Sequence, residues 1–222
     1  MCIRDSYRRQ KLSKSSWKAS VKTIVVGNIT VGGNGKTPFV IWLANILKKN
    51  GSKPGIISRG YKSVSKKFPL SVDSDTQVYD SGDEAKIISN STQCPLVVGP
   101  KRVDSSKYLL DNYDCDVLIT DDGLQHYALG RDIEIAMVDG IKKFGNKLML
   151  PAGPLREPIK RLNEVDFIVN TNSFCNNESE RKQNEFLMTY KPISWINICT
   201  KKTYEIHAVS YTHLTLPTNT TV

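Results

Sequence analysis

The sequence predicts an α/β fold in which a doubly wound, mostly parallel sheet carries helices on both faces. From Val21 onward, short apolar runs rich in β-branched residues alternate with segments of helical periodicity, as in successive βαβ units. A glycine-rich segment, 27–38, joins the first apolar run to the first helical segment. The 222 residues, of which 39% are hydrophobic and 24% charged, suffice for one such domain and the start of a smaller second one.

The predicted elements follow one another in the order that this fold requires. The first strand is expected at 22–26, a continuous apolar and β-branched run, and the first helix at about 36–49. Gly51 then ends this helix, because glycine readily adopts the positive φ found at helix C-termini. The later elements are expected as strands at 53–58, 95–98, 116–120, 133–138 and 166–170, and as helices at 83–89 and 102–110.

Two connections, 59–82 and 140–157, contain Gly and Pro and are longer than a compact α/β fold needs. Long ordered loops in such folds commonly carry functional residues. After them, the polar, Asn-rich segment 171–185 predicts a domain boundary, and 195–199 and 204–209 alternate like strands of a second domain. The expected parts are a basic amino-terminal segment (1–20), a core domain (21–170), a linker with the start of an incomplete carboxy-terminal domain (171–209) and a tail (210–222).

The two ends of the chain differ in character from the rest. Residues 1–6 and 210–222 join no periodic segment, and we expect both to be non-native remnants of sequencing adapters on a piece of a longer protein. Residues 1–22 carry seven Lys or Arg and one Asp, which leaves about +3 of the net charge of +9 for the remaining residues. A solvated tail explains this cluster most simply, while Trp17 among the lysines favours contact with a membrane surface.

Cysteine usage and hydropathy exclude several classes of protein. The five cysteines are an odd number and form no CxxC pair, which argues for a reducing compartment and against a disulfide framework or a zinc site. No stretch approaches the ~18 consecutive apolar residues of a membrane-spanning helix. We expect a soluble chain without a nucleic-acid partner.

The most specific motif is GNITVGGNGKTP, residues 27–38, between a predicted strand and a predicted amphipathic helix. This is the context of a P-loop, in which backbone N–H groups surround nucleotide phosphates at a helix N-terminus. Lys36 would reach the terminal phosphates of ATP, and the Thr37 hydroxyl would coordinate Mg²⁺. The predicted nucleotide-binding residues are Thr30, Gly32, Gly33, Asn34, Gly35, Lys36 and Thr37.

The loop departs from the strict P-loop pattern at one position. Thr30 stands where the pattern has glycine, and Gly32, Gly33 and Gly35 supply the flexibility instead. The alternative is a glycine-rich turn with Lys36 in solvent. The order strand, loop, Gly-Lys-Thr, helix favours the P-loop.

Acidic residues follow another predicted strand. Asp121 and Asp122 end the apolar run 116–120, as a Walker B aspartate does, and either could hold Mg²⁺; the alternative is an ordinary Asp-Asp-Gly turn. His126 could orient these carboxylates or contact phosphate, although a lone histidine is as often structural. The acidic pair beside a P-loop favours a metal–nucleotide site.

Three further pairs of residues carry weaker signals. Asp83 and Glu84 begin a predicted helix, where acidic residues are also favourable simply at the N-terminus. Arg102, after Lys101, likewise opens a helix, where a cation is unfavourable unless it binds an anion such as phosphate. Arg156 and Glu157 lie in a proline-rich loop, which suits a rigidly placed guanidinium for transition-state charge but also a surface ion pair.

Together these segments resemble the tetraacyldisaccharide 4'-kinase family of the lipid A pathway. The resemblance extends over about 21–209 and rests on five ordered motifs: GNITVGGNGKTP (27–38), SRGY (58–61), SGDEA (81–85), TDDGLQHYALGRDIEI (120–135) and FGNKLMLPAGPLREP (144–158). It implies a P-loop kinase that uses ATP and Mg²⁺ to phosphorylate the 4'-hydroxyl of an acylated glucosamine disaccharide 1-phosphate, giving lipid IVA. It also implies a peripheral, monomeric enzyme at the cytoplasmic face of the bacterial inner membrane.

The resemblance assigns roles to individual residues. Asp83 matches the aspartate that acts on the attacking hydroxyl, with Lys36, Arg156 and His126 as the other predicted catalytic residues. The predicted magnesium ligands are Thr37, Asp121, Asp122 and Glu157, and Glu84, Arg102 and Gln125 are expected to line the site.

The chain also departs from the family pattern. Family members carry an amino-terminal hydrophobic anchor and a carboxy-terminal domain with a histidine that assists the catalytic aspartate, and neither is found here; His207 is not that histidine. Two other readings therefore stay open: a P-loop GTPase or ATPase of the metallochaperone type, for which an NKxD or CxxC motif is lacking, and a nucleotide-binding fragment without turnover.

Overall fold

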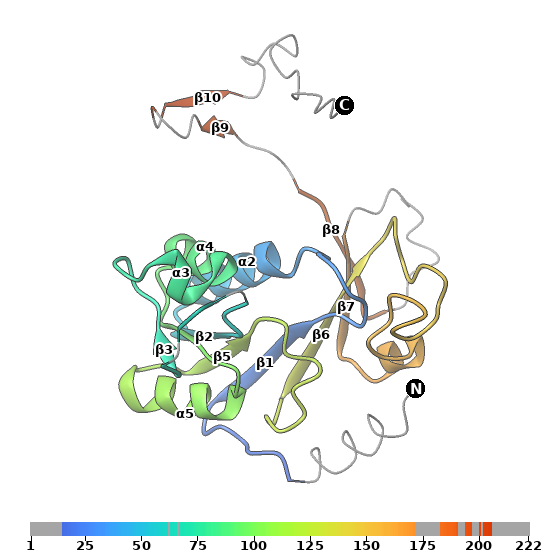
Figure 1. Cartoon of the computed structure of the whole chain (residues 1–222), viewed down its shortest axis with the longest axis horizontal. Helices are drawn as coiled ribbons and strands as arrows, with labels where there is room; N and C mark the ends of the chain where they lie inside the picture. Colours follow the sequence, from blue (N-terminus) through green and yellow to red (C-terminus); the bar gives the residue numbers. More distant parts are fainter. Residues whose placement is uncertain are drawn as a thin grey trace. The chain divides into compact units, whose positions relative to one another are not determined.

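A computed structural model describes residues 15–61, 63–65, 67–171, 183–190, 194–196, 200 and 202–205. The chain divides into two compact units, Met1–Met188 and Thr189–Val222. The first unit has the predicted α/β fold, a mostly parallel sheet with helices on both faces (Figure 1).

The sheet of the first unit has eight strands in the order β3-β4-β2-β5-β1-β6-β7-β8. Its neighbouring strands pair in parallel, except that β3 runs antiparallel to β4. The strand bounds are β1 (Lys22–Gly27), β2 (Pro54–Ser58), β3 (Leu70–Ser71), β4 (Leu96–Val98), β5 (Val117–Thr120), β6 (Ile133–Asp139), β7 (Phe167–Thr171) and β8 (Glu185–Met188).

The helices cover the two faces of the sheet unequally. α2 (Lys36–Lys49) and α4 (Asp83–Thr92) pack on one face, where Phe39 and Ile88 join a core with Ile24 and Met137. α5 (Arg102–Asn112) lies on the opposite face (Figure 1). The short helices are α3 (Val78–Ser81) and the 3-10 helix η1 (Ile159–Asn163). Because both faces of β1 are covered, its residues after Lys22 are all buried, as the continuous apolar run requires.

The predicted helices and strands of the core are confirmed with small shifts at their ends. α2 has the expected bounds, and α4 and α5 extend two or three residues beyond the expected 83–89 and 102–110. The strands begin or end within one residue of their predicted positions.

The predicted domain boundary differs from the structure. β8 lies in the segment interpreted as a linker, and its Phe186 pairs with Val169 of β7, so the first compact unit continues to Met188. In the second unit, β9 (Ser194–Ile196) and β10 (Thr203–Glu205) form an antiparallel pair, within or next to the two strands expected there. The expectations for 1–6 and 210–222 lie outside the described residues.

Trp17 does not support the interpretation of a membrane-facing residue. Its backbone N–H donates to the carbonyl of Ala128 at 2.9 Å, and its ring packs against the buried cluster that contains Leu109 and Leu118. Lys107 lies 5.6 Å from the ring centroid, a cation–π contact. The half-buried indole therefore anchors the entry to β1 against the core.

Two further observations concern membranes and thiols. Among the residues that the structure describes, no helix has the length and apolar character to cross a bilayer. Cys94 and Cys115 are buried free thiols, and burial raises the pKa of Cys115 to about 11. Cys2, Cys175 and Cys199 lie outside the described residues.

Candidate nucleotide-binding and phosphoryl-transfer site

The glycine-rich loop and the acidic pair leave the sheet at the same edge, because β1 and β5 are adjacent and parallel. Val25 is in register with Thr120, so β5 ends at this pair and β1 ends two residues later, at Gly27. The amide of Gly123 donates to the carbonyl of Val26 at 2.9 Å, which fastens the acidic turn to β1. Ligand sites of open α/β sheets lie at this carboxyl edge.

The glycine-rich loop is open toward a ligand and braced from within. A Cβ placed on Gly32 or Gly33 would meet nothing within 4 Å, and Gly35, with φ 74°, begins α2 without a side-chain cap. Asn34 is buried and donates through Nδ2 to Thr30 Oγ1 at 2.8 Å. The hydrogen bond between Thr30 and Asn34, both predicted nucleotide-binding residues, thus stabilises the shape of the loop. The open side of the loop is suited to phosphate groups.

Lys36 and Arg156 meet at the carboxylate of Asp122. Lys36 Nζ lies 3.5 Å from Oδ1, and Arg156 Nη1 lies 3.0 Å from Oδ2. Burial alone would raise the pKa of Asp122, but the two positive charges hold that pKa below its ordinary value. The structure therefore brings together three of the predicted site residues around one ionised carboxylate.

Asp121 has a different environment from its neighbour. Its side chain is buried, with Ser58 Oγ 3.5 Å from Oδ2, and Oδ1 has no hydrogen-bond partner in the described structure. Burial, together with the charges of Glu84 and Asp122, raises the pKa of Asp121 to about 6. A buried carboxylate oxygen without a donor is suited to a cation, which would supply the missing charge.

Arg102 shapes the site and was predicted to contact phosphate. The side chain is 2% exposed, and its two Nη groups donate to the carbonyls of Gly99 at 2.9 Å and Asp121 at 3.0 Å. Burial lowers the pKa of Arg102 to about 10, so it remains charged. With both Nη groups bonded to backbone, Arg102 holds the Asp121 turn in place, in contrast to the predicted phosphate contact.

His126 lies in the loop after the acidic pair. Burial, and then the charges of Arg102 and Arg59, lower the pKa of His126 to about 4. The imidazole is therefore neutral at pH 7 and can offer one N–H donor and one acceptor, but not a positive charge.

Asp83 and Glu84 occupy the first turn of α4 as predicted, and both side chains are exposed. Gly82 precedes them with φ 84° and ψ 154°, a conformation that other residues rarely adopt. A Cβ on Gly82 would also lie 2.4 Å from the carbonyl oxygen of Tyr61. This glycine therefore fixes the backbone at the point where α4 begins with Asp83.

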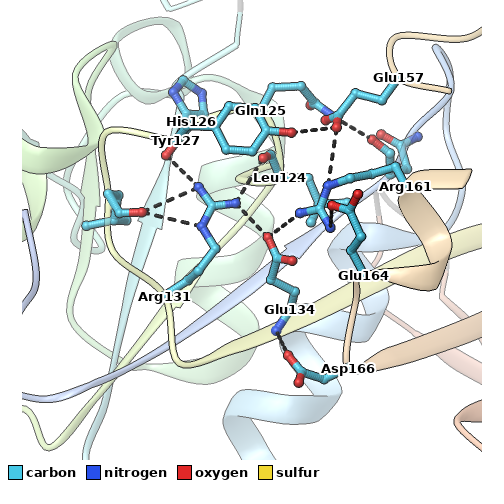
Figure 2. A network of polar contacts seen from close by, with 12 residues as sticks. Leu124, Gln125, His126, Tyr127, Arg131, Glu134, Glu157, Arg161, Glu164 and Asp166 are labelled. Carbon is cyan, nitrogen blue, oxygen red and sulfur yellow. Dashed lines mark hydrogen bonds and ion pairs between the residues drawn. The ribbon is translucent and has the colours of Figure 1, made fainter. Parts of the chain in front are cut away.

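Glu157, a predicted magnesium ligand, contacts protein side chains through its carboxylate. Gln125 Nε2 donates to Oε1 at 2.7 Å, Tyr127 Oη donates to Oε2 at 2.5 Å, and Arg161 Nε lies 3.4 Å from Oε2 (Figure 2). Both oxygens of this buried carboxylate are thus occupied by protein groups. Glu157 as a metal ligand stays a prediction.

Sequence reasoning missed the residues behind Glu157. A network of ion pairs and hydrogen bonds, here called the Arg161 cluster, links Tyr127, Arg131, Glu134, Glu157 and Arg161 (Figure 2). The only signal in the sequence was Glu134 within an otherwise apolar strand, since a charge buried there needs a partner.

The structure does not test the predicted Mg²⁺ site. Within the described residues, no three His, Cys, Asp or Glu side chains form a candidate metal site. Mg²⁺ commonly takes only one or two carboxylates and completes its coordination with phosphates and water. Asp121 and Asp122, with Thr37 at the start of α2, remain the residues suited to that ion.

Comparison with known proteins gives a consistent result. A family model described as tetraacyldisaccharide-1-P 4'-kinase matches residues 1–215. A tetraacyldisaccharide 4'-kinase from Vibrio cholerae serotype O1 is 48% identical over 197 residues, which cover 89% of this chain and 56% of that protein. One from Nitrosococcus oceani is 57% identical over 146 residues, covering 66% of this chain and 43% of that protein.

A solved structure is similar in fold as well. It is the crystal structure described as the "apo" form of LpxK from Aquifex aeolicus in complex with ATP, with a TM-score of 0.70 and 31% sequence identity. The match covers 83% of this chain and 59% of that one. The matched segments thus span between 43% and 59% of the length of these relatives.

Proposed function

The chain belongs to the tetraacyldisaccharide-1-P 4'-kinase family, and from this premise we propose a specific reaction for it. It binds ATP and transfers the γ-phosphoryl group to the 4'-hydroxyl of an acylated glucosamine disaccharide 1-phosphate, which yields lipid IVA. The observation that carries the proposal is the convergence of Lys36 and Arg156 on Asp122 beside the open glycine loop.

The proposed roles follow from the charge that phosphoryl transfer develops. The loop amides at Gly32–Gly35 bind the β- and γ-phosphates, and Lys36 and Arg156 neutralise the charge on the transferred group. Asp83 accepts the proton of the attacking 4'-hydroxyl, so that the new P–O bond forms as the bond to ADP breaks. His126, neutral at pH 7, donates or accepts a hydrogen bond near these groups.

The Mg²⁺ ion has a proposed place among these residues. Thr37, Asp121 and Asp122 would hold it, and when bound it would neutralise charge on the phosphates. In support, Asp121 offers a buried oxygen without a hydrogen-bond donor in the described structure. Glu84 raises the pKa of Asp121 by its charge and is proposed to line the same region.

The cellular setting is also part of the proposal. Because the acceptor carries acyl chains, the reaction takes place at a membrane, and we place it at the cytoplasmic face of the bacterial inner membrane, where ATP is available. The proposed contact is peripheral and uses the basic amino-terminal residues, since a positive segment is attracted to anionic headgroups. One copy of the chain supplies all the residues named above, so we propose a monomer.

Transfer of label to a defined acceptor tests the function. The 222-residue chain is incubated with [γ-³²P]ATP, Mg²⁺ and tetraacyldisaccharide 1-phosphate, with GTP in place of ATP in a parallel reaction. Label in the lipid that depends on ATP is the expected result. ATP hydrolysis without lipid labelling, a preference for GTP, or nucleotide binding without any turnover would each contradict the proposal and favour one of the other P-loop functions.

A further inference from the structure

The Arg161 cluster joins two segments that are distant in the sequence, 127–134 and 157–161. Arg131, after the acidic loop, and Arg161, in η1, both contact Glu134 of β6: Arg131 Nη1 lies 2.8 Å from Glu134 Oε1, and an Nη group of Arg161 reaches the same oxygen. Arg161 is 2% exposed at its side chain and Glu134 is 12% exposed. These partners hold Arg161 in place. Its Nε also lies 3.4 Å from Glu157 Oε2.

A continuous series of contacts runs from this cluster to the proposed catalytic arginine. Glu157 accepts a hydrogen bond from Gln125 Nε2 at 2.7 Å, and the same amide nitrogen donates to the carbonyl of Asn28 at 2.9 Å. These two acceptors fix the amide plane of Gln125, whose Oε1 lies 3.5 Å from Arg156 Nη1. Arg156 in turn reaches Asp122.

Tyr127 completes the hold on Glu157. Its hydroxyl donates to Glu157 Oε2 at 2.5 Å, and the Arg131 guanidinium lies 5.0 Å from its ring centroid. Burial, followed by the hydrogen bond and charge of Glu157, raises the pKa of Tyr127 to about 12, so the hydroxyl keeps its proton and remains a donor.

Arg156 itself needs such support. Its side chain is 30% exposed, and long exposed side chains occupy many rotamers unless other groups fix them. In the described structure its guanidinium also lies beside Gln125, whose orientation depends on Glu157. A guanidinium displaced by about 1 Å loses much of its effect on a transition state.

We infer that Tyr127 and Arg161 are positioning residues, which hold Glu157 so that Gln125 and then Arg156 keep one orientation over the phosphate-binding loop. The inference rests on the proposed function only for the chemical part played by Arg156. The contacts themselves predict that the Arg156 side chain is ordered, and this order can be measured without any reaction.

Nuclear magnetic resonance of the arginine side chains tests the inference directly. The 222-residue chain is labelled with ¹⁵N-arginine, and the Arg156 Nε–Hε signal is assigned by its loss in Arg156→Lys. We expect this signal to shift and broaden in Tyr127→Phe, which removes one hydroxyl, and to stay unchanged in Tyr108→Phe, the same change at an exposed position of α5. An Arg156 signal that is identical in Tyr127→Phe and the wild type would overturn the inference.

Arg161→Lys provides a second route if Tyr127→Phe fails to fold. Lysine keeps the charge but cannot contact Glu134 and Glu157 through separate nitrogen atoms in a planar group. The same loss of order at Arg156 is expected, while thermal unfolding monitors the folded fraction. Loss of stability with an unchanged Arg156 signal would show a structural role only and would overturn the inference.

Kinetics adds a test of positioning in the reaction. Tyr127→Phe is expected to lower kcat about tenfold with little change in the KM for ATP, and to have no further effect in the Arg156→Lys background, because the two residues act through one group. Additive losses would count against the inference. A wild-type chain that transfers no phosphoryl group would contradict the proposed function, whereas the Arg156 signal would still decide the positioning question.

Discussion

Arg156 contacts both carboxylate oxygens of Asp122 through one nitrogen, with Nη1 3.2 Å from Oδ1 and 3.0 Å from Oδ2. Asp122 has φ 54°, so it turns sharply after β5, and Lys36 approaches Oδ1 from α2 at 3.5 Å. In this arrangement one negative charge offsets only one of the two positive charges. Phosphate groups entering the loop would be attracted by the remaining positive charge.

Lys36→Ala is expected to remove lipid labelling, with a loss of about 100-fold or more in kcat/KM, because the charge on the transferred phosphoryl group loses its nearest cation. The measurement is initial-rate kinetics with ATP and the acylated disaccharide. Lys49→Ala, at the other end of the same helix, serves as the control and should behave like the wild type. Equal rates in Lys36→Ala and Lys49→Ala would refute the assignment.

Asp83→Asn tests the proposed proton acceptor. The variant should lose most of kcat while its dissociation constant for a fluorescent ATP analogue stays within about twofold, since the carboxylate acts on the acceptor hydroxyl and not on the nucleotide. Asp104→Asn, a change of the same kind in the first turn of α5, should alter neither quantity. A variant that binds nucleotide weakly but keeps kcat would contradict this role for Asp83.

The raised pKa of Asp121 predicts an unusual dependence of the stability of the folded chain on pH. Its pKa is raised from 3.8 to about 6 on folding, so the folded chain holds its proton more tightly and stability falls as pH rises through this window. At pH 7.5 the ionised carboxylate costs on the order of 3 kcal/mol. Asp121→Asn should therefore unfold at higher urea concentration than the wild type at pH 7.5, with an advantage that shrinks toward pH 4.

Two conditions sharpen this experiment. The measurements are made without nucleotide or Mg²⁺, because a bound cation would favour the ionised form. Asp111→Asn, the same substitution at an exposed position, serves as the control for the substitution itself. If Asp121→Asn and the wild type kept a constant difference between pH 4 and pH 7.5, the raised pKa would be wrong.

Glu134→Gln is expected to destabilise the chain by about 3 kcal/mol or more, because Arg131 and Arg161 would lose the carboxylate between them while staying buried. Chemical denaturation at pH 7.5 measures the loss. Glu164→Gln changes a partner of Arg161 that is 49% exposed and should cost less than about 1 kcal/mol. Similar losses in the two variants would mean that burial does not set the strength of these pairs.

Gly82→Ala separates backbone conformation from crowding at the entry to α4. Gly82 and Gly51 both have positive φ, at 84° and 87°, but only Gly82 would place a Cβ 2.4 Å from a backbone oxygen. Gly51→Ala should cost about 1 kcal/mol from the conformation alone. Gly82→Ala should lower the melting temperature further, and a smaller loss than in Gly51→Ala would contradict the crowding.

The regular elements could be predicted because their signals are local. The run 22–26 and the helix 36–49 are fixed by residues next to one another, through burial of a continuous apolar segment and through helical periodicity. The loop 140–157 was expected to be functional, and the structure does bring Arg156 to Asp122. The chemical roles of these residues remain predictions.

The missed features depend on contacts between distant residues. β8 is a strand of only four residues after a polar segment, and its pairing with β7 leaves no periodic pattern. Trp17 was interpreted from its lysine neighbours, whereas its place is set by Ala128, far along the chain. Glu134, the partner of Arg161 on β6, lies 27 residues earlier in the chain, so spacing could not reveal this pair.

The carbonyl of Ile29 accepts hydrogen bonds from two consecutive amides, Arg156 at 2.7 Å and Glu157 at 3.3 Å, and the amide of Val31 donates back to the carbonyl of Pro154 at 2.8 Å. These hydrogen bonds connect the segment before the glycines, which contains Ile29 and Val31, to the segment that carries Arg156. A shift of one segment on nucleotide binding would therefore be passed through these bonds to the other, and the backbone that carries Arg156 would move together with the phosphate-binding loop.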